Sequence, residues 1–249
     1  HKMSEVMENS DRITVLKDGR VEDEMLSKDA TIERLTKAVV GSRSLNKIQR
    51  KTTKEKSNVL LKVENIYADN DRGLTALHDI SFSIHTGEIL AIAGVAGSGQ
   101  RELAETLAGL RKVKSGRIMM NNKDITKTSA KHRISAGISF IPEDRLKMGL
   151  IPGMDLKQNA ILKKFRNPEY SRYGILRRKS IRAIAERYVE TYGIRGGGID
   201  LPVSMMSGGN QQKLLVAREI DCQPALIIAA YPVRGLDIGA AEAINNILK

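Results

Sequence analysis

The chain of 249 residues is 41% hydrophobic, which suffices for the buried core of one large or two modest domains. No run of about 18 apolar residues occurs and no signal peptide precedes the first periodic segment, so we expect a globular protein that works inside the cell. The single cysteine, Cys222, excludes an internal disulfide and a multi-cysteine metal site, and we interpret it as a packing residue. The net charge of +12 suits nucleotides, nucleic acid or acidic lipid headgroups.

Much of the positive charge gathers in two clusters. They comprise Lys47, Arg50, Lys51, Lys54 and Lys56, and then Lys163, Lys164, Arg166, Arg172, Arg177, Arg178, Lys179, Arg182 and Arg187. Proteins that bind single-stranded nucleic acid interleave aromatic side chains with such charge, whereas aromatic residues are 4% here and Trp is absent. We therefore expect no nucleic-acid partner and interpret the clusters as a solvated basic face, with some preference for an anionic membrane surface.

The first predicted unit is a small αβ piece. Ile13 and Val15 alternate with polar residues before the turn-forming Asp18-Gly19, which predicts a pair of short strands that resumes at Val21. Apolar residues at helical spacing then predict a helix over residues 31–40, ended by Gly41. The following residues are polar and basic, so we place a linker at residues 44–57.

The second predicted unit alternates strands and helices, the pattern of an α/β fold. We expect strands at residues 59–66, 80–84, 89–93, 117–120 and 138–141, helices at residues 102–110 and 130–135, and a basic, largely helical insert between Gly149 and Pro202. Ser207 begins another helix, and residues 225–230 predict a strand buried on both faces of a parallel sheet.

The residues Gly94–Arg101, here called the glycine loop, stand between the strand predicted at 89–93 and the next helix. Gly94 and Gly99 have the spacing of the phosphate-binding template G-x-x-x-x-G-K-[ST]. Gln100 replaces the lysine of the template and Arg101 replaces its metal-binding hydroxyl. Backbone N–H groups, including those of Gly97 and Ser98, still predict an anion cradle, but one that hydrolyses poorly.

A second motif lies about 110 residues later, at Met206–Lys213. It resembles the signature motif of ATP-binding cassette (ABC) proteins, in the form typical of importers for simple sugars and nucleosides. Its candidate binding residues are Ser207, Gly208, Gly209 and Gln211. Ser207 is a natural N-cap, and the helix dipole behind it favours an anion such as a γ-phosphate.

The resemblance covers essentially the whole chain. The sequence Ile141–Arg145 is similar to the region that stands in for the Gln loop in this importer type, with Glu143 as the equivalent residue. Tyr67 occupies the place of an adenine-stacking aromatic, or is simply packed at a strand end. The sequence Arg234–Asp237 resembles the loop that follows the Walker B strand and crosses to the partner cassette, with Asp237 as its aspartate. The resemblance implies a P-loop NTPase fold with a central, mostly parallel sheet, an antiparallel β edge and a helical insert at about residues 150–205.

The Walker B strand of this family ends in Asp-Glu-Pro, where the Asp serves Mg²⁺ and the Glu polarises water. Here Ala230 and Tyr231 hold those places before Pro232. Neither side chain binds a metal as a carboxylate or accepts a proton from water. With the lysine and hydroxyl also replaced, we expect hydrolysis at this site to be lost and no metal to bind there.

The beginning of the chain resembles the end of a cassette, with His1 as its switch histidine, although His1 is alternatively a tag remnant. We therefore expect residues 1–43 to end a preceding cassette and residues 58–249 to form a second one that stops before its own switch histidine. The resemblance implies one catalytic composite site, in which the first cassette and His1 hold ATP and Mg²⁺ against the signature motif of the second.

The leading expectation is the ATP-binding subunit of an importer for nucleosides or simple sugars, and the nucleoside branch is favoured by the Ala-Ala-x-Pro sequence. Its implied partners are membrane permeases, contacted through the helical insert, and an extracytoplasmic substrate-binding protein, which places it on the cytoplasmic face of the cell membrane. The alternative is a non-catalytic nucleotide-binding or regulatory module. A nucleic-acid-associated cassette is a third class, supported by little beyond charge.

Overall fold

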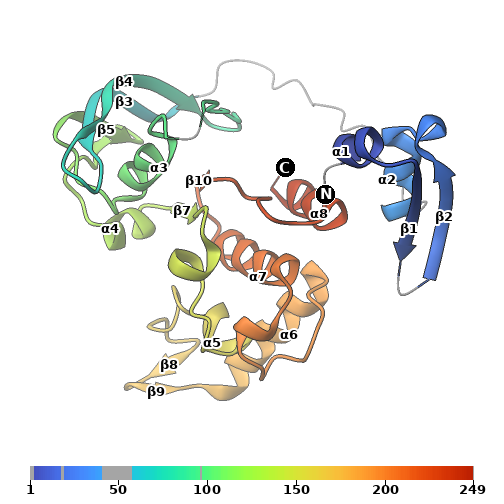
Figure 1. Ribbon diagram of the computed structural model, residues 1–249. Coiled ribbons are helices and arrows are strands. Elements are labelled where there is room, and N and C mark those ends of the chain that lie inside the picture. Colours follow the sequence, from blue (N-terminus) through green and yellow to red (C-terminus); the bar gives the residue numbers. More distant parts are fainter. Residues whose placement is uncertain (1–2, 18–19, 41–57, 96, 249) are drawn as a thin grey trace. The chain divides into compact units, whose positions relative to one another are not determined.

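The computed structural model describes residues 3–17, 20–40, 58–95 and 97–248, and the chain divides into two compact units (Figure 1). The first comprises His1–Lys51 with Gly235–Lys249, and the second Thr52–Arg234. His1, the Asp18-Gly19 turn, Gly41 and the predicted linker lie outside the described residues. No helix in the described ranges combines the length and apolar character needed to cross a membrane.

The N-terminal part of the first unit is built on a hairpin. Its elements are α1 (Met3–Asn9), β1 (Arg12–Lys17), β2 (Arg20–Leu26), a 3₁₀ turn (Ser27–Asp29) and α2 (Ile32–Val40), and the same unit includes α8 (Ile238–Ile247). The strands are antiparallel, with Ile13 opposite Met25 in the core. The predicted strand pair and helix are therefore confirmed, whereas α8 was not predicted.

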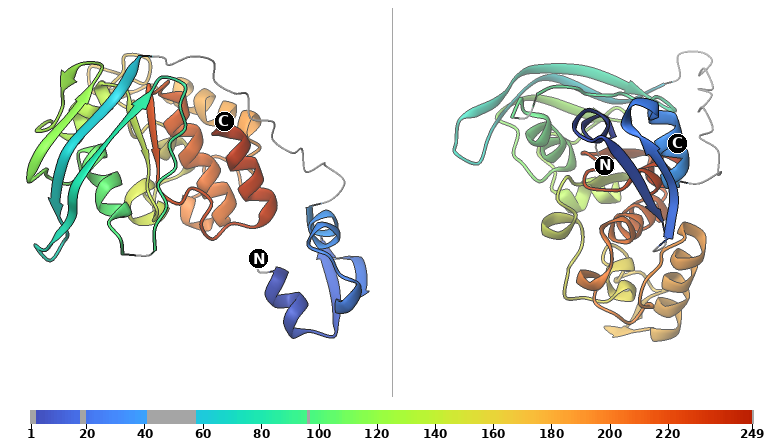
Figure 2. Two further views of the ribbon diagram at one scale, coloured as in Figure 1. Left: turned by 90° about the horizontal axis from the view of Figure 1, so that it is seen from above. Right: turned by 45° about the vertical axis from the view of Figure 1, so that its right-hand side comes forward.

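The second unit opens with an antiparallel sheet in the order β4-β3-β5-β6. Its strands are β3 (Val59–Asp69), β4 (Thr75–His85), β5 (Ser115–Met120) and β6 (Lys123–Asp124). One face of this sheet packs on α3 (Gln100–Ala108) through Leu103 and Leu107. The next helix, α4 (Ala130–Ser135), carries the buried Arg133. Figure 2 shows this sheet as the long cyan and green strands beside α3.

A parallel pair follows, β7 (Ile138–Ile141) with β10 (Leu226–Ala229). Between them in sequence lie a π-helical turn (Arg145–Gly149), α5 (Leu156–Ala160), β8 (Ser171–Arg172), β9 (Ile175–Leu176), α6 (Arg178–Tyr192), a 3₁₀ turn (Val203–Met205) and α7 (Gly208–Asp221). Helices α5, α6 and α7 pack on one another, and α7 also packs on β7. The insert is thus helical as predicted, but it also contains the unpredicted β8–β9 hairpin.

A buried ionic cluster fastens the insert to the parallel pair. Glu219 of α7 is 1% exposed, and its carboxylate accepts hydrogen bonds from Arg218 at 3.1 and 3.0 Å and from Lys163. Arg218 also donates to the carbonyl of Gly149 at 2.7 Å. Buried charges persist where they are paired in this way, because isolated ones lose their hydration without compensation.

The strand predicted at residues 89–93 is wrong. Ile89–Ala93 adopts no strand in the described chain, and Ile89 is 79% exposed. A pocket of about 620 Å³ separates this run from β10. The backbone hydrogen bonds that would pair residues 89–93 with β10 as a neighbouring strand are therefore not formed. The prediction that residues 225–230 are buried on both faces is corrected for the same reason: β10 pairs with β7 on one side, and only its Leu226 is fully buried. Apolar character alone does not supply a hydrogen-bonded neighbour.

Candidate nucleotide site

The glycine loop ends at the N-terminus of α3, as predicted. Gly97 and Gly99 adopt φ angles of 87° and 93°, which glycine accepts without strain. A Cβ on Gly99 would lie 2.9 Å from the carbonyl oxygen of Ala76, so space as well as conformation requires glycine there. Gly99 is the N-cap of α3 and offers no side chain to its first N–H groups. These groups therefore fit an anion such as a phosphate.

Gln100 folds back onto the loop. Its amide Nε2 donates to the carbonyl of Val95 at 3.3 Å, and a Cβ on Gly94 would lie 2.3 Å from the same nitrogen. The side chain thus bridges the two ends of the loop, at the position where the template places a lysine. Ser98 is exposed, and its N–H also donates to Val95. The Gln100 amide and the N–H of Ser98 are thus bonded within the loop, and Gln100 brings no positive charge to a phosphate.

Arg101 is held by two carboxylates, one on α3 and one in the loop between β3 and β4. Its guanidinium donates to Glu105 at 2.7 Å and to Asp71 at 3.2 Å. Arg111 contacts the same two carboxylates at 2.6 Å each and, as the largest influence, lowers the pKa of Asp71. Arg101 therefore stands where the template needs a metal-binding hydroxyl, with its own charge already paired.

The opposite wall of the 620 Å³ pocket carries the end of β10. Ala230, Tyr231 and Glu143 line it together with Gln100 and Arg101, so the structure brings all these predicted residues to one place. Glu143 forms an ion pair with Arg234, and Tyr231 has a positive φ of 48° and is half exposed.

The donor set of this pocket does not fit Mg²⁺. Hard divalent cations take oxygen ligands, chiefly carboxylates. Ala230 supplies none, and Glu143, the carboxylate that lines the pocket, is paired with Arg234. Throughout the described ranges no group of three or more His, Cys, Asp or Glu residues is arranged to hold a metal. The four missing chemical groups at this site, like nucleotide binding itself, stay a prediction.

The signature motif forms the start of α7. Ser207 is its N-cap and accepts from Asn210, both from its backbone N–H at 3.5 Å and from its side chain at 2.9 Å. Gln211 is buried, and its Nε2 donates to the carbonyls of Val203 and Met206 at 3.0 Å. Gln211 consequently holds the segment before the helix, while Gly208 and Gly209 bring no side chains of their own to its first turn.

Arg145 connects the two predicted regions, and sequence reasoning did not single it out. Its Nε donates to the Oε1 of Gln211 at 3.1 Å, and its Nη1 donates to the carbonyl of Arg234 at 3.3 Å. A Cβ on Gly208 would lie 2.5 Å from its Nη2. Because Arg234 also pairs with Glu143, a continuous chain of polar contacts runs from the pocket to the signature motif. The sequence contained Arg145 in the Ile141–Arg145 motif, but no spacing rule revealed its partner.

The remaining predicted residues lie elsewhere. Tyr67 of β3 packs edge-on against His78, with ring centroids 6.3 Å apart, and does not line the pocket. Asp237 is the N-cap of α8, where its side chain accepts from Ala240 at 2.8 Å. Cys222 ends α7, and burial raises the pKa of its thiol.

Comparison with known proteins identifies the fold that carries this site. A family model described as "ABC transporter" matches residues 77–233, which include the glycine loop, the signature motif and β10. The chain belongs to the ABC transporter family. This confirms the predicted family and its P-loop NTPase fold.

Relatives of this cassette include importer proteins from bacteria and archaea. The chain is 37% identical over 248 residues to the nucleoside import ATP-binding protein NupA of Lactococcus lactis, with 100% of this chain and 49% of NupA covered. It is 38% identical to the glucose import ATP-binding protein TsgD13 of Haloferax volcanii, with 100% and 45% covered. It is 36% identical to the guanosine import ATP-binding protein NupO of Bacillus subtilis, with 96% and 46% covered. The chain therefore spans about half the length of the curated relatives it matches.

Solved structures share the cassette fold. A nucleotide-free ATP-binding cassette from an ABC transporter matches with a TM-score of 0.61 at 24% identity, with 77% of this chain and 76% of that chain covered. A dimeric cassette in a post-hydrolysis state, bound to ADP and Pi, matches with a TM-score of 0.62 at 23% identity, with 76% and 81% covered.

Proposed function

We propose that this chain is part of the ATP-binding subunit of an ABC importer that energises the uptake of nucleosides or simple sugars, with nucleosides favoured. The printed functions of its relatives support this substrate class, since they include nucleoside, guanosine and glucose import. The signature sequence in the form Ser-Gly-Gly-Asn-Gln-Gln and the Ala-Ala-Tyr-Pro sequence at the end of β10 agree with it. The subunit as a whole hydrolyses ATP.

Within this subunit, the site built from the glycine loop and β10 does not hydrolyse ATP. The observation that carries this proposal is the paired state of the residues at the replaced positions: Gln100 is bonded to Val95, and Arg101 is held by Glu105 and Asp71. Ala230 and Tyr231 supply no metal ligand and no base. The loop retains backbone N–H groups that would hold a phosphate, so the site binds nucleotide weakly or serves as a silent surface.

The signature motif of this cassette completes the active composite site. Ser207 and its neighbours Gly208, Gly209 and Gln211 would face an ATP held by a preceding cassette, whose switch histidine is His1. Mg²⁺ at that site would neutralise charge on the transferred phosphoryl group. The N-terminus of α7, capped by Ser207, would contribute its dipole and N–H groups to the γ-phosphate.

The proposed assembly is the one expected of an importer. The subunit would lie on the cytoplasmic face of the cell membrane, bound to permeases, with an extracytoplasmic protein delivering the substrate. Closure of the two cassettes on ATP would move the helical insert at about residues 150–205, and this motion would reach the permeases.

Two substitutions in the full-length subunit, assembled with its permeases, test whether ATP is hydrolysed at the signature motif and not at the glycine loop of this cassette. Ser207→Arg should abolish ATPase activity, because the larger cation blocks the N-terminus of α7. Gln100→Ala should change turnover far less than replacement of the loop lysine in the first cassette. ATPase activity unchanged by Ser207→Arg, or equal losses from the two loop substitutions, would overturn the assignment.

A non-catalytic nucleotide-binding or regulatory module is the second candidate, favoured by the uncapped N-terminus of α3. It predicts ATP binding to this cassette that alters activity elsewhere without turnover of its own. Equilibrium binding of labelled ATP, measured before and after Gly99→Arg, separates a nucleotide-holding module from a cassette that binds none.

A further inference from the structure

The β8–β9 hairpin exposes apolar side chains at its tip. Ser171 pairs with Leu176 and Arg172 with Ile175, and Tyr173 and Gly174 form the turn with positive φ angles of 52° and 80°. Tyr173 is 90% exposed, Ile175 74% and Leu176 50%. In Figure 1 the hairpin projects from the edge of the insert. No described residue of this unit buries these side chains, although burying them would be favourable.

Cations without carboxylate partners flank this hairpin in the sequence. Residues 163–187 contain nine Lys and Arg residues but only two carboxylates, Glu169 and Glu186. Five of those cations are used internally: Lys163, Lys164, Arg177, Arg182 and Arg187 contact carboxylates or backbone carbonyls. The other four, Arg166, Arg172, Arg178 and Lys179, form no ion pair with any residue in the described ranges.

Two of these cations extend over aromatic rings. The guanidinium of Arg172 lies 5.3 Å from the centroid of Tyr173, and that of Arg166 lies 5.3 Å from the centroid of Phe165, which is 45% exposed. Each pair therefore presents an apolar body and a positive head side by side. Amphipathic combinations of this kind favour the boundary between water and lipid.

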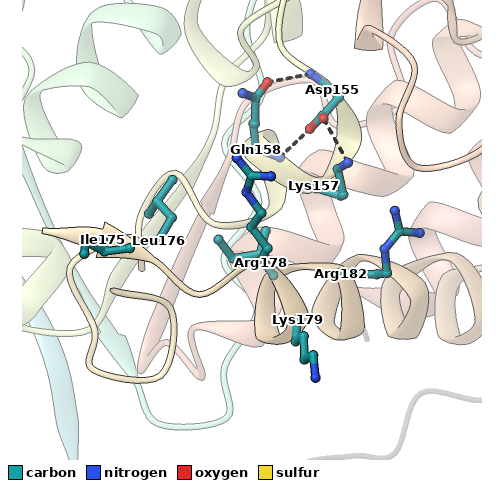
Figure 3. Close-up of a pocket in the computed structure, with 9 residues that line it drawn as sticks. Asp155, Lys157, Gln158, Ile175, Leu176, Arg178, Lys179 and Arg182 are labelled. Carbon is teal, nitrogen blue, oxygen red and sulfur yellow. Dashed lines mark hydrogen bonds and ion pairs between the residues drawn. The ribbon is translucent and has the colours of Figure 1, made fainter. Parts of the chain in front are cut away.

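A pocket of about 650 Å³ lies beside the hairpin and is lined both by cations that are paired and by the unpaired Arg178 and Lys179. Figure 3 shows Ile175 and Leu176 on one side of this pocket and Arg182 on the other, with Arg178 and Lys179 between them. The inner cation Lys157 pairs with Asp155 and Asp200, and Arg182 pairs with Glu186 and Asp200. The interior is thus neutralised within the chain, while Arg178 and Lys179 stay available beside the hairpin.

We propose that the hairpin tip and its surrounding cations form a docking surface for the anionic headgroups of a lipid bilayer. A projecting tip with an aromatic and two aliphatic side chains suits insertion between headgroups, and four unpaired cations suit their phosphates. An acidic peptide that entered the pocket would meet Lys157 and Arg182, which are already paired, and would leave the exposed Tyr173 in water. A nucleic acid would use the cations without requiring Ile175 or Leu176. The proposal is independent of ATP chemistry and adds a direct lipid contact to the proposed attachment through permeases.

Vesicle flotation of the full-length protein, without permeases or nucleotide, tests this surface. Vesicles of phosphatidylcholine alone should capture little protein, whereas vesicles with about one third phosphatidylglycerol should capture it in a salt-sensitive manner. The double substitution Arg178→Glu with Lys179→Glu should lower the partition coefficient at least about tenfold, because each cation near an anionic surface contributes separately. Tyr173→Ser with Ile175→Ser should lower it by a similar factor.

Matched controls lie on the antiparallel sheet side of the same unit. Lys123→Glu with Lys131→Glu makes the same charge change at exposed positions, and Leu74→Ser removes an exposed apolar side chain in the β3–β4 turn. Both controls should alter the partition coefficient less than about twofold. The proposal would be overturned if Lys123→Glu with Lys131→Glu lowered the partition coefficient as much as Arg178→Glu with Lys179→Glu. It would also be overturned if Tyr173→Ser with Ile175→Ser left the partition coefficient unchanged, since either result means a nonspecific effect of net charge.

A second readout does not depend on the charge variants. This chain has no Trp, so Tyr173→Trp places a fluorophore at the tip. Its emission, taken as a difference from the unsubstituted protein, should shift to shorter wavelength on anionic vesicles and be quenched by brominated lipid tails. An unchanged spectrum on vesicles that capture the protein would show that the tip stays in water and would refute insertion.

Discussion

The guanidinium of Arg145 donates to the side-chain oxygen of Gln211 across 3.1 Å, although 66 residues separate them in sequence. Gln211 in turn fixes Val203 and Met206, the residues that precede the signature helix. Arg145 therefore acts as a positioning residue for the motif that we propose completes the active site. Its other contact, to the carbonyl of Arg234, joins the signature helix to the loop that follows β10.

Arg145→Met should lower the ATPase activity of the full subunit about ten- to a hundredfold, because displacement of a positioning group by 1 Å has effects of that size. Lys147→Met is the control, since Lys147 belongs to the same π-helical turn and its side chain is 84% exposed. Steady-state kinetics should show a fall in kcat with little change in KM. A loss equal to that of Lys147→Met would leave Arg145 without a positioning role.

Repair of the glycine loop should restore nucleotide affinity but not hydrolysis. Gln100→Lys combined with Arg101→Ser returns the lysine and the hydroxyl of the template. The site would still lack the metal carboxylate and the base at Ala230 and Tyr231, so turnover at this cassette should remain absent. Fluorescent-nucleotide titration and a phosphate-release assay, with the first cassette inactivated, measure the two properties separately. Turnover in this variant would show that the replaced positions after β10, Ala230 and Tyr231, do not limit the chemistry.

Arg133 should be essential for stability, because it is the hub of the contact between α3 and α4. It is 1% exposed, and its guanidinium donates to the carbonyls of Thr106, Leu107, Ile125 and Thr126 at 2.5–3.1 Å. Two of these carbonyls end α3, where the helix dipole favours a cation. Burial lowers the pKa of Arg133, but a guanidinium stays charged in proteins.

Arg133→Met leaves these buried carbonyls without donors, so the free energy of unfolding should fall by about 3 kcal/mol or more. The free energy of unfolding of Arg133→Lys should lie between those of the unsubstituted protein and Arg133→Met, since an ammonium reaches fewer acceptors than the planar guanidinium of arginine. Urea unfolding followed by circular dichroism gives the values. His132→Ala, at the exposed neighbouring position, should change stability by less than about 0.5 kcal/mol.

Acid should weaken the attachment of α7 to the insert through Asp221. Burial alone would raise the pKa of this carboxyl, but hydrogen bonding from Lys164 and the charge of Arg187 outweigh burial and hold the pKa below its ordinary value. A carboxyl with a lowered pKa in the folded state adds stability above its unfolded pKa, about 3.9, and loses it as the pH falls through the folded value.

Asp221→Asn should therefore destabilise the protein at pH 7, and its difference from the unsubstituted protein should shrink below about pH 4. Urea unfolding at pH 7, 5 and 3.5 measures this convergence. Glu190→Gln on α6 is the control, because Glu190 is exposed and forms no ion pair with a described residue. A difference that stays constant across the pH range would mean that the Asp221 carboxylate contributes through packing and not through charge.

Sequence reasoning found the elements whose pattern is local. The alternation in Val59–Asp69, the N-cap at Ser207 and the helix after Gly99 depend on residues a few positions apart, and each appears in the structure. The prediction of a strand at Ile89–Ala93 was wrong because a strand also needs a neighbour, which no local pattern can specify. The Arg145–Gln211 contact and the β8–β9 hairpin were missed for related reasons: the first joins distant residues, and the second is only two residues long in each strand.

The unpaired run before the glycine loop changes what nucleotide binding would mean for this cassette. Residues Ile89–Ala93 precede the loop but are not paired in a sheet. Binding of a phosphate at Gly97 and Gly99 would therefore have to order residues 89–93 as well. Binding would then be coupled to strand formation, with a negative heat-capacity change as Ile89 and Ile92 leave water. Amide hydrogens along this run, fast to exchange in the free protein, would slow when nucleotide is added, whereas those of the doubly paired β3 would not.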